Sequence, residues 1–65
     1  MKEFTTNRNS KAIELINVIC REERLDIQIR FETTAIGDDV IIAKGEKEEI
    51  EVLEQIFKMV YNIGL

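Results

Sequence analysis

The 65-residue sequence contains no histidine, no proline and no tryptophan, and its one cysteine is Cys20. A single cysteine excludes a disulfide within the chain. The absence of histidine removes the commonest catalytic base and a usual zinc ligand. No apolar run approaches the roughly 20 residues that a membrane-spanning helix needs. We therefore expect a non-enzymatic protein without metal, cofactor or membrane partner, located in the cytoplasm, where a lone thiol stays reduced.

The composition is that of a folded protein rather than a disordered one, with 45% apolar and 34% charged residues. We expect one small domain over residues 1–65, in which residues 1–8 form either an edge strand or a flexible tail. A domain of this size buries only about 60% of the surface of its unfolded chain, and small domains usually add a disulfide or a metal. With neither expected here, association with a second copy or with another protein becomes the favoured source of stability.

Apolar periodicity predicts two helices, over residues 10–23 and 46–62. Asn9 or Ser10 can cap the first, whose polar residues form only a narrow stripe, so that most of its surface is apolar. The second begins after Gly45 in a cluster of acidic residues, where the helix dipole favours negative charge. Its main apolar stripe consists of Ile50, Leu53, Phe57 and Val60.

Residues 25–34 alternate between apolar and polar side chains, which predicts a strand with one buried face. Residues 35–39 contain Gly37 and two aspartates, as expected for a hairpin loop. The apolar run 40–43 then predicts a short strand that is partly buried on both faces. Residues 2–6 are interpreted as an added edge strand, since Phe4 would gain burial.

These elements predict an α+β fold, a small (β)-α-β-β-α two-layer sandwich in which two helices cover one face of an antiparallel hairpin. Ile29 and Leu53 are assigned to its core. The open face of the sheet is expected to carry Asp26, Gln28, Arg30 and Glu32, with Ile41 and Ala43 beside them.

From residue 2 to residue 62 this order resembles the small KH-like module that precedes the ATPase domain of PhoH-type proteins, where a hairpin is likewise followed by Gly-Glu and a long apolar helix, as in Ala43-Lys44-Gly45-Glu46. It is similar also to the helix–hairpin–helix layout of some small phage anti-CRISPR proteins. The first resemblance implies a nucleic-acid-binding module, and the second an anti-defence inhibitor encoded by a phage or other mobile element. The Gly-x-x-Gly loop by which KH domains clamp a nucleic-acid backbone has no counterpart here, so neither resemblance assigns a functional residue.

The net charge of −4 is unevenly distributed. Residues 1–30 carry six basic and five acidic side chains, whereas residues 31–65 carry three basic and eight acidic ones. This acidic balance disfavours a general phosphate-binding surface, although Arg8, Lys11, Arg21 and Arg24 leave a local basic strip. Two adjacent carboxylates, as in Asp38-Asp39, do not supply the spaced ligands of a cation loop.

The candidate partner-binding residues all belong to the second helix. Acidic residues crowd its start, and a second apolar stripe runs beside the first. The candidate residues are the acidic Glu46, Glu48 and Glu49 and, in the second stripe, Val52, Ile56, Met59 and Ile63. The stripe either packs against the first helix or forms an exposed patch that meets a second copy or another protein. The acidic residues either form a solvated helix face or a rim that meets a basic partner.

The leading hypothesis is a protein-binding regulator or inhibitor that occupies a partner's surface. The alternatives are a KH-like nucleic-acid-binding module, which uses the open sheet face or the basic strip, and a structural subunit that folds as a homo-oligomer, most simply a homodimer.

Overall fold

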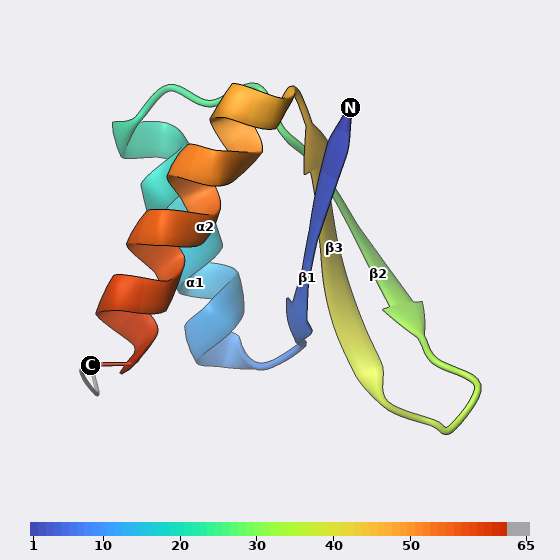
Figure 1. The fold of residues 1–65 in the computed structure, drawn as a ribbon. Coiled ribbons are helices and arrows are strands. Elements are labelled where there is room, and N and C mark those ends of the chain that lie inside the picture. Colours follow the sequence, from blue (N-terminus) through green and yellow to red (C-terminus); the bar gives the residue numbers. More distant parts are fainter. Residues whose placement is uncertain (63–65) are drawn as a thin grey trace.

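The computed structural model describes residues 1–62, which form three strands and two helices (Figure 1). In chain order they are β1 (Lys2–Asn7), α1 (Ser10–Glu22), β2 (Gln28–Thr33), β3 (Asp39–Gly45) and α2 (Lys47–Asn62). The strands form one antiparallel sheet in the order β1-β3-β2, and both helices lie on the same face of it (Figure 1). The predicted α+β class and the (β)-α-β-β-α order are confirmed, with residues 2–7 as a strand.

Local signals explain where α1 begins and ends. The Asn9 side chain accepts a hydrogen bond of 2.8 Å from the Ala12 N–H, which satisfies one of the free amides of the first turn. At the other end Arg24 takes a φ of 55°, and the Leu25 N–H bonds the carbonyl of Cys20 at 2.9 Å. A left-handed residue after the last turn is a common helix stop, here made without glycine.

The core lies between β1, β3 and the two helices. Its buried residues are Phe4, Ala12, Ile16, Ile19, Ile41, Ala43, Ile50, Leu53 and Phe57. The assignment of Leu53 to the core is confirmed, since it is 0% exposed. Phe4 packs edge-on against Phe57, with ring centroids 5.3 Å apart. Helix α2 lies against β1 and β3, and α1 packs against α2.

The assignment of Ile29 to the core is wrong, because this residue on β2 is 36% exposed. Phe31, two residues later on the same face, is 48% exposed. The cause is the strand order: β3 occupies the centre of the sheet and α2 covers β3 and β1, so the helix-side surface of β2 is only partly covered.

The predicted composition of the open face is also wrong in part. Ile41 and Ala43 point into the core, and Ile42 is the apolar residue that directly opposes Arg30 on the open face. Opposed residues of an antiparallel pair share a face, so a shift of one residue exchanges the two faces of β3. The predicted burial of this strand on both faces is confirmed, because Ile42 is 8% exposed.

Candidate partner-binding surface

The acidic residues at the start of α2 differ in their surroundings. Glu46 precedes the helix and is exposed, and its carbonyl accepts the first backbone bond, from Ile50 at 2.9 Å. Glu48 is exposed in the first turn. Glu49 is half-buried, and its carboxylate accepts a hydrogen bond of 2.7 Å from the backbone N–H of Asp26. Glu49 thus ties the start of α2 to the segment that joins α1 to β2.

Replacing Glu49 with alanine is expected to lower the free energy of unfolding by about 1 kcal/mol, because the Asp26 amide loses its acceptor. Glu48→Ala, in the same turn but exposed, is the matched control and is expected to change it by less than about 0.5 kcal/mol. Urea unfolding followed by circular dichroism measures both. Equal effects would show that the hydrogen bond of Glu49 does not contribute to stability.

The predicted second stripe of α2 is divided by the structure. Ile56 is half-buried and packs against the core, and Val52 is half-buried one turn earlier. Met59 is 63% exposed. Ile63 lies outside the described residues. The stripe therefore contributes both to the contact between the helices and to the outer surface beside it.

An open apolar groove runs between α1 and α2 on their outer side. It has a volume of about 300 Å³ and is lined by Leu15, Val18, Ile19, Glu22, Glu23, Ile56 and Val60. A second hollow of about 270 Å³ continues it past Lys11 and Glu14. Of the predicted site residues that fall within residues 1–62, only Ile56 lines the groove. Leu15, Val18 and Val60 were not predicted as site residues. The sequence signal for Leu15 and Val18 was the excess of apolar positions on the first helix, and Val60 was assigned to the main apolar stripe of the second.

The groove is rimmed mainly by carboxylates. Glu22 and Glu23 lie at its α1 end and are exposed, as is Glu14 at the continuation. Among the described residues that line the two hollows, Lys11 is the one cation, and it already lies over the ring of Tyr61, 4.7 Å from its centroid. An occupant of this groove would therefore meet an apolar floor and a negative border.

The thiol of Cys20 does not take part in the groove. It is half-buried on α1 and packs against the core. Burial raises its pKa, and the nearby charge of Glu49 raises it further. A thiol with a raised pKa stays protonated at neutral pH and is a weak nucleophile.

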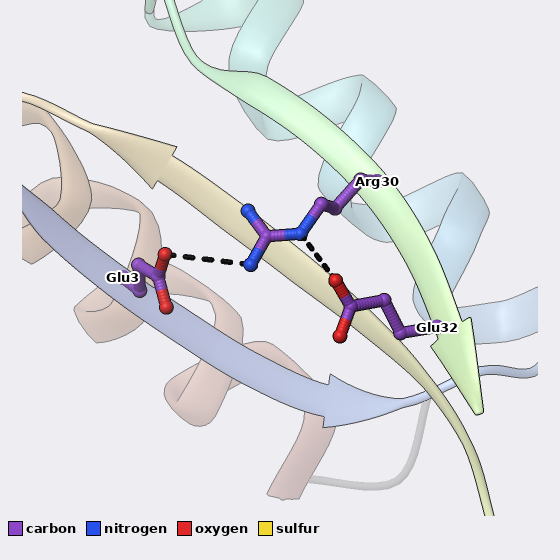
Figure 2. Close-up of polar contacts among 3 residues, drawn as sticks. All are labelled: Glu3, Arg30 and Glu32. Carbon is purple, nitrogen blue, oxygen red and sulfur yellow. Dashed lines mark hydrogen bonds and ion pairs between the residues drawn. The ribbon is translucent and has the colours of Figure 1, made fainter. Parts of the chain in front are cut away.

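The open face of the sheet carries a small ion-pair cluster. Figure 2 shows the guanidinium of Arg30 over β3, between Glu32 of its own strand and Glu3 of β1. The nitrogen–oxygen distances are 2.7 Å to Glu32 and 3.5 Å to Glu3. The hydrogen bond to Glu32 and the two negative charges raise the pKa of Arg30, which is already fully charged. Arg30 is thus engaged by two carboxylates, which weakens the open face as a phosphate-binding surface.

The residues of the predicted basic strip lie at both ends of α1. Arg8 precedes the helix and covers part of the Phe31 ring at 4.5 Å, whereas Arg21 and Arg24 lie at the far end. A 13-residue helix is about 20 Å long, so these cations do not form one cluster.

Comparison with known proteins found no family model, curated protein or solved structure that matches this chain. Within residues 1–62, none of the helices has the length and apolar character needed to cross a membrane. The same residues bring together no group of three or more side chains suited to hold a metal ion.

Proposed function

We propose that this protein is a non-enzymatic regulator or inhibitor that works by occupying part of another protein's surface. The observation that carries the proposal is the apolar groove between α1 and α2, which is open to solvent along its length. Surface apolar groups that are grouped and rimmed by charge are typical of protein interaction sites. The free Cys20 thiol is in keeping with action in the cytoplasm.

The chemistry of the groove points to one class of partner. Its floor consists of aliphatic side chains, including Val18 and Val60, which suit the apolar face of a helix. Its rim of Glu14, Glu22 and Glu23, together with a net charge of −4, favours basic residues beside that face. We therefore infer an amphipathic helical segment with flanking lysine or arginine, whose association slows as salt screens the charges.

The acidic start of α2 is the second part of the proposed surface. Glu46 and Glu48 are exposed and free to meet a basic partner surface, and Met59 adds an exposed apolar contact on the same helix. A KH-like nucleic-acid module is less favoured, because its candidate cations are either paired with carboxylates, as Arg30 is, or separated along α1.

The experiment that tests the proposal compares two charge insertions on α1. Val18→Glu places a carboxylate in the groove floor, and it is expected to weaken capture of the partner at least about tenfold. Asn17→Glu adds the same charge one residue away, at an exposed position outside the groove, and is expected to leave capture unchanged. The measurement is affinity capture from host lysate with nuclease, followed by mass spectrometry and titration of the captured protein.

Thermal melting of both variants verifies that they fold. Loss of one stoichiometric protein with Val18→Glu alone supports the proposal. Equal capture by both variants would contradict the groove as the binding site. Ribonucleoproteins that disappear with nuclease would instead favour the nucleic-acid module.

A further inference from the structure

Strand β2 has an edge that no described part of the chain covers. It lies at the border of the sheet, and the hairpin that it forms with β3 projects away from both helices (Figure 1). All six of its residues are exposed, Ile29 and Phe31 among them. It contains no proline, lysine or bulge, which are among the devices by which edge strands avoid pairing, and its two charged residues, Arg30 and Glu32, have opposite signs.

The hydrogen-bond pattern identifies which backbone groups point to this edge. The Thr34 N–H donates to the Asp38 carbonyl at 2.8 Å, so Thr34 and Asp38 form a hydrogen-bonded pair. Hydrogen-bonded and non-hydrogen-bonded pairs alternate along an antiparallel hairpin, which fixes the type of every pair between β2 and β3. Gln28, Arg30 and Glu32 then exchange bonds with β3, and the N–H and C=O groups of Ile29, Phe31 and Thr33 point outward. Within residues 1–62, no backbone bond outside the sheet involves these three residues.

We propose that β2 pairs with β2 of a second copy, antiparallel and about a twofold axis at Phe31, to form a continuous six-stranded sheet. This inference concerns the opposite side of the molecule from the groove and does not depend on the proposed function.

Among the registers centred on residues 29 to 32 of β2, charge complementarity favours this one. Pairing requires that the outward-pointing residues of both copies oppose each other. With the axis at Phe31, Arg30 opposes Glu32 of the second copy, and the symmetric pair forms on the other side of the axis. The guanidinium of Arg30, which bonds Glu32 and Glu3 of its own chain, would share these carboxylates with that of the second copy. With the axis at Arg30 or at Glu32, two like charges face each other at the axis. With the axis at Ile29, Glu32 opposes Asp26 of the second copy, which is again repulsive.

The apolar face of β2 favours the same arrangement. The axis at Phe31 brings the two Phe31 rings together and sets Ile29 beside Thr33 of the second copy, all on the helix side of the sheet. Phe31 is 48% exposed in the single chain, with Arg8 over part of its ring. A cavity of about 40 Å³ between Phe31, Ile29 and α1 marks this region as incompletely packed. Pairing would cover the exposed apolar surface that the helices leave on β2.

A charge-reversal experiment tests both the contact and its register. Arg30→Glu and Glu32→Arg each set like charges opposite each other in the proposed dimer, so each is expected to raise the dimer dissociation constant about tenfold or more. In an equimolar mixture, the two glutamates of the Arg30→Glu chain face the two arginines of the Glu32→Arg chain. The mixture is therefore expected to recover the dimer. Sedimentation equilibrium over a range of concentrations compares wild type, both variants and the mixture, and thermal melts confirm that the variants fold.

Amide hydrogen exchange gives a second, residue-level measurement. Dimerisation is expected to slow exchange at Ile29, Phe31 and Thr33, and to leave Arg30 and Glu32, which already bond β3, unchanged. A wild-type chain that stays monomeric as concentration rises would overturn the proposal. So would single variants that dimerise like wild type, or a mixture that fails to recover the dimer. If the wild type is a dimer that the Val18→Glu variant loses and the Arg30→Glu variant keeps, the groove and not β2 is the contact, and the proposal is overturned.

Discussion

Replacing Leu53 with aspartate is expected to unfold the protein. Leu53 is fully buried in the middle of α2, among the residues that face the sheet, and a carboxylate at that place has no partner. Burying a charge without a partner costs several kcal/mol even when the group takes up a proton. A 65-residue domain has a total stability of roughly 3–10 kcal/mol, so the change removes most or all of it. Loss of the helical circular-dichroism signal and of a cooperative melt is the expected result.

Met59→Asp is the matched control, with the same new residue on the same helix. Met59 is 63% exposed, so its replacement leaves the aspartate in water and is expected to change the stability by less than about 0.5 kcal/mol. A Leu53→Asp variant that melts like wild type would show that the core between α2 and the sheet is wrongly assigned.

The helices could be predicted from the sequence almost to the residue because their signals are local. The predicted ranges 10–23 and 46–62 differ from the observed helices by one residue at one end of each. An apolar period, a cap such as Asn9 and a breaker such as Gly45 all act within one or two turns. None of them requires knowledge of what the helix packs against.

The sheet was harder to predict, because the pairing and the burial of its strands depend on distant parts of the chain. Alternation along 25–34 correctly placed Ile29 and Phe31 on the helix side, but it does not tell how far the helices extend across the sheet. The run 40–43 has no alternation at all, so only the pairing with β2 decides that Ile41 points inward. The loop begins at Thr34 rather than at Ala35, and such shifts decide which face each residue takes.

The groove illustrates the same limit for a binding surface. The apolar excess on both helices was visible in the sequence and raised two interpretations, mutual packing or an exposed patch. Each interpretation holds for part of α2: Ile56 packs against the core, whereas Met59 is exposed. Val18 and Leu15 become candidate contact residues only when the packing of the two helices is known, since both line the groove and its continuation together with Val60 of α2.

Replacing Phe57 with alanine is expected to cost about 3–5 kcal/mol, which approaches the full stability of a domain of this size. Phe57 joins three elements: its ring packs edge-on against Phe4 of β1 and stacks on Tyr61 at 5.0 Å, and Tyr61 in turn accepts a hydrogen bond of 3.2 Å from Asn9 before α1. Removing the ring leaves a cavity in the core and abolishes the aromatic contacts with Phe4 and Tyr61. Urea unfolding, with the midpoint and slope fitted together, measures the loss.

Phe31→Ala is the control for Phe57→Ala, since it makes the same change at a phenylalanine that already has about half of its surface in water. Its expected cost is below about 1.5 kcal/mol, because little additional apolar area is lost from the core. Both variants are compared at a dilution where self-association does not contribute, since Phe31 lies at the proposed strand contact. A loss at Phe31 as large as that at Phe57 would mean that β2 is covered in the monomer. The exposed apolar surface from which the strand pairing is inferred would then not exist.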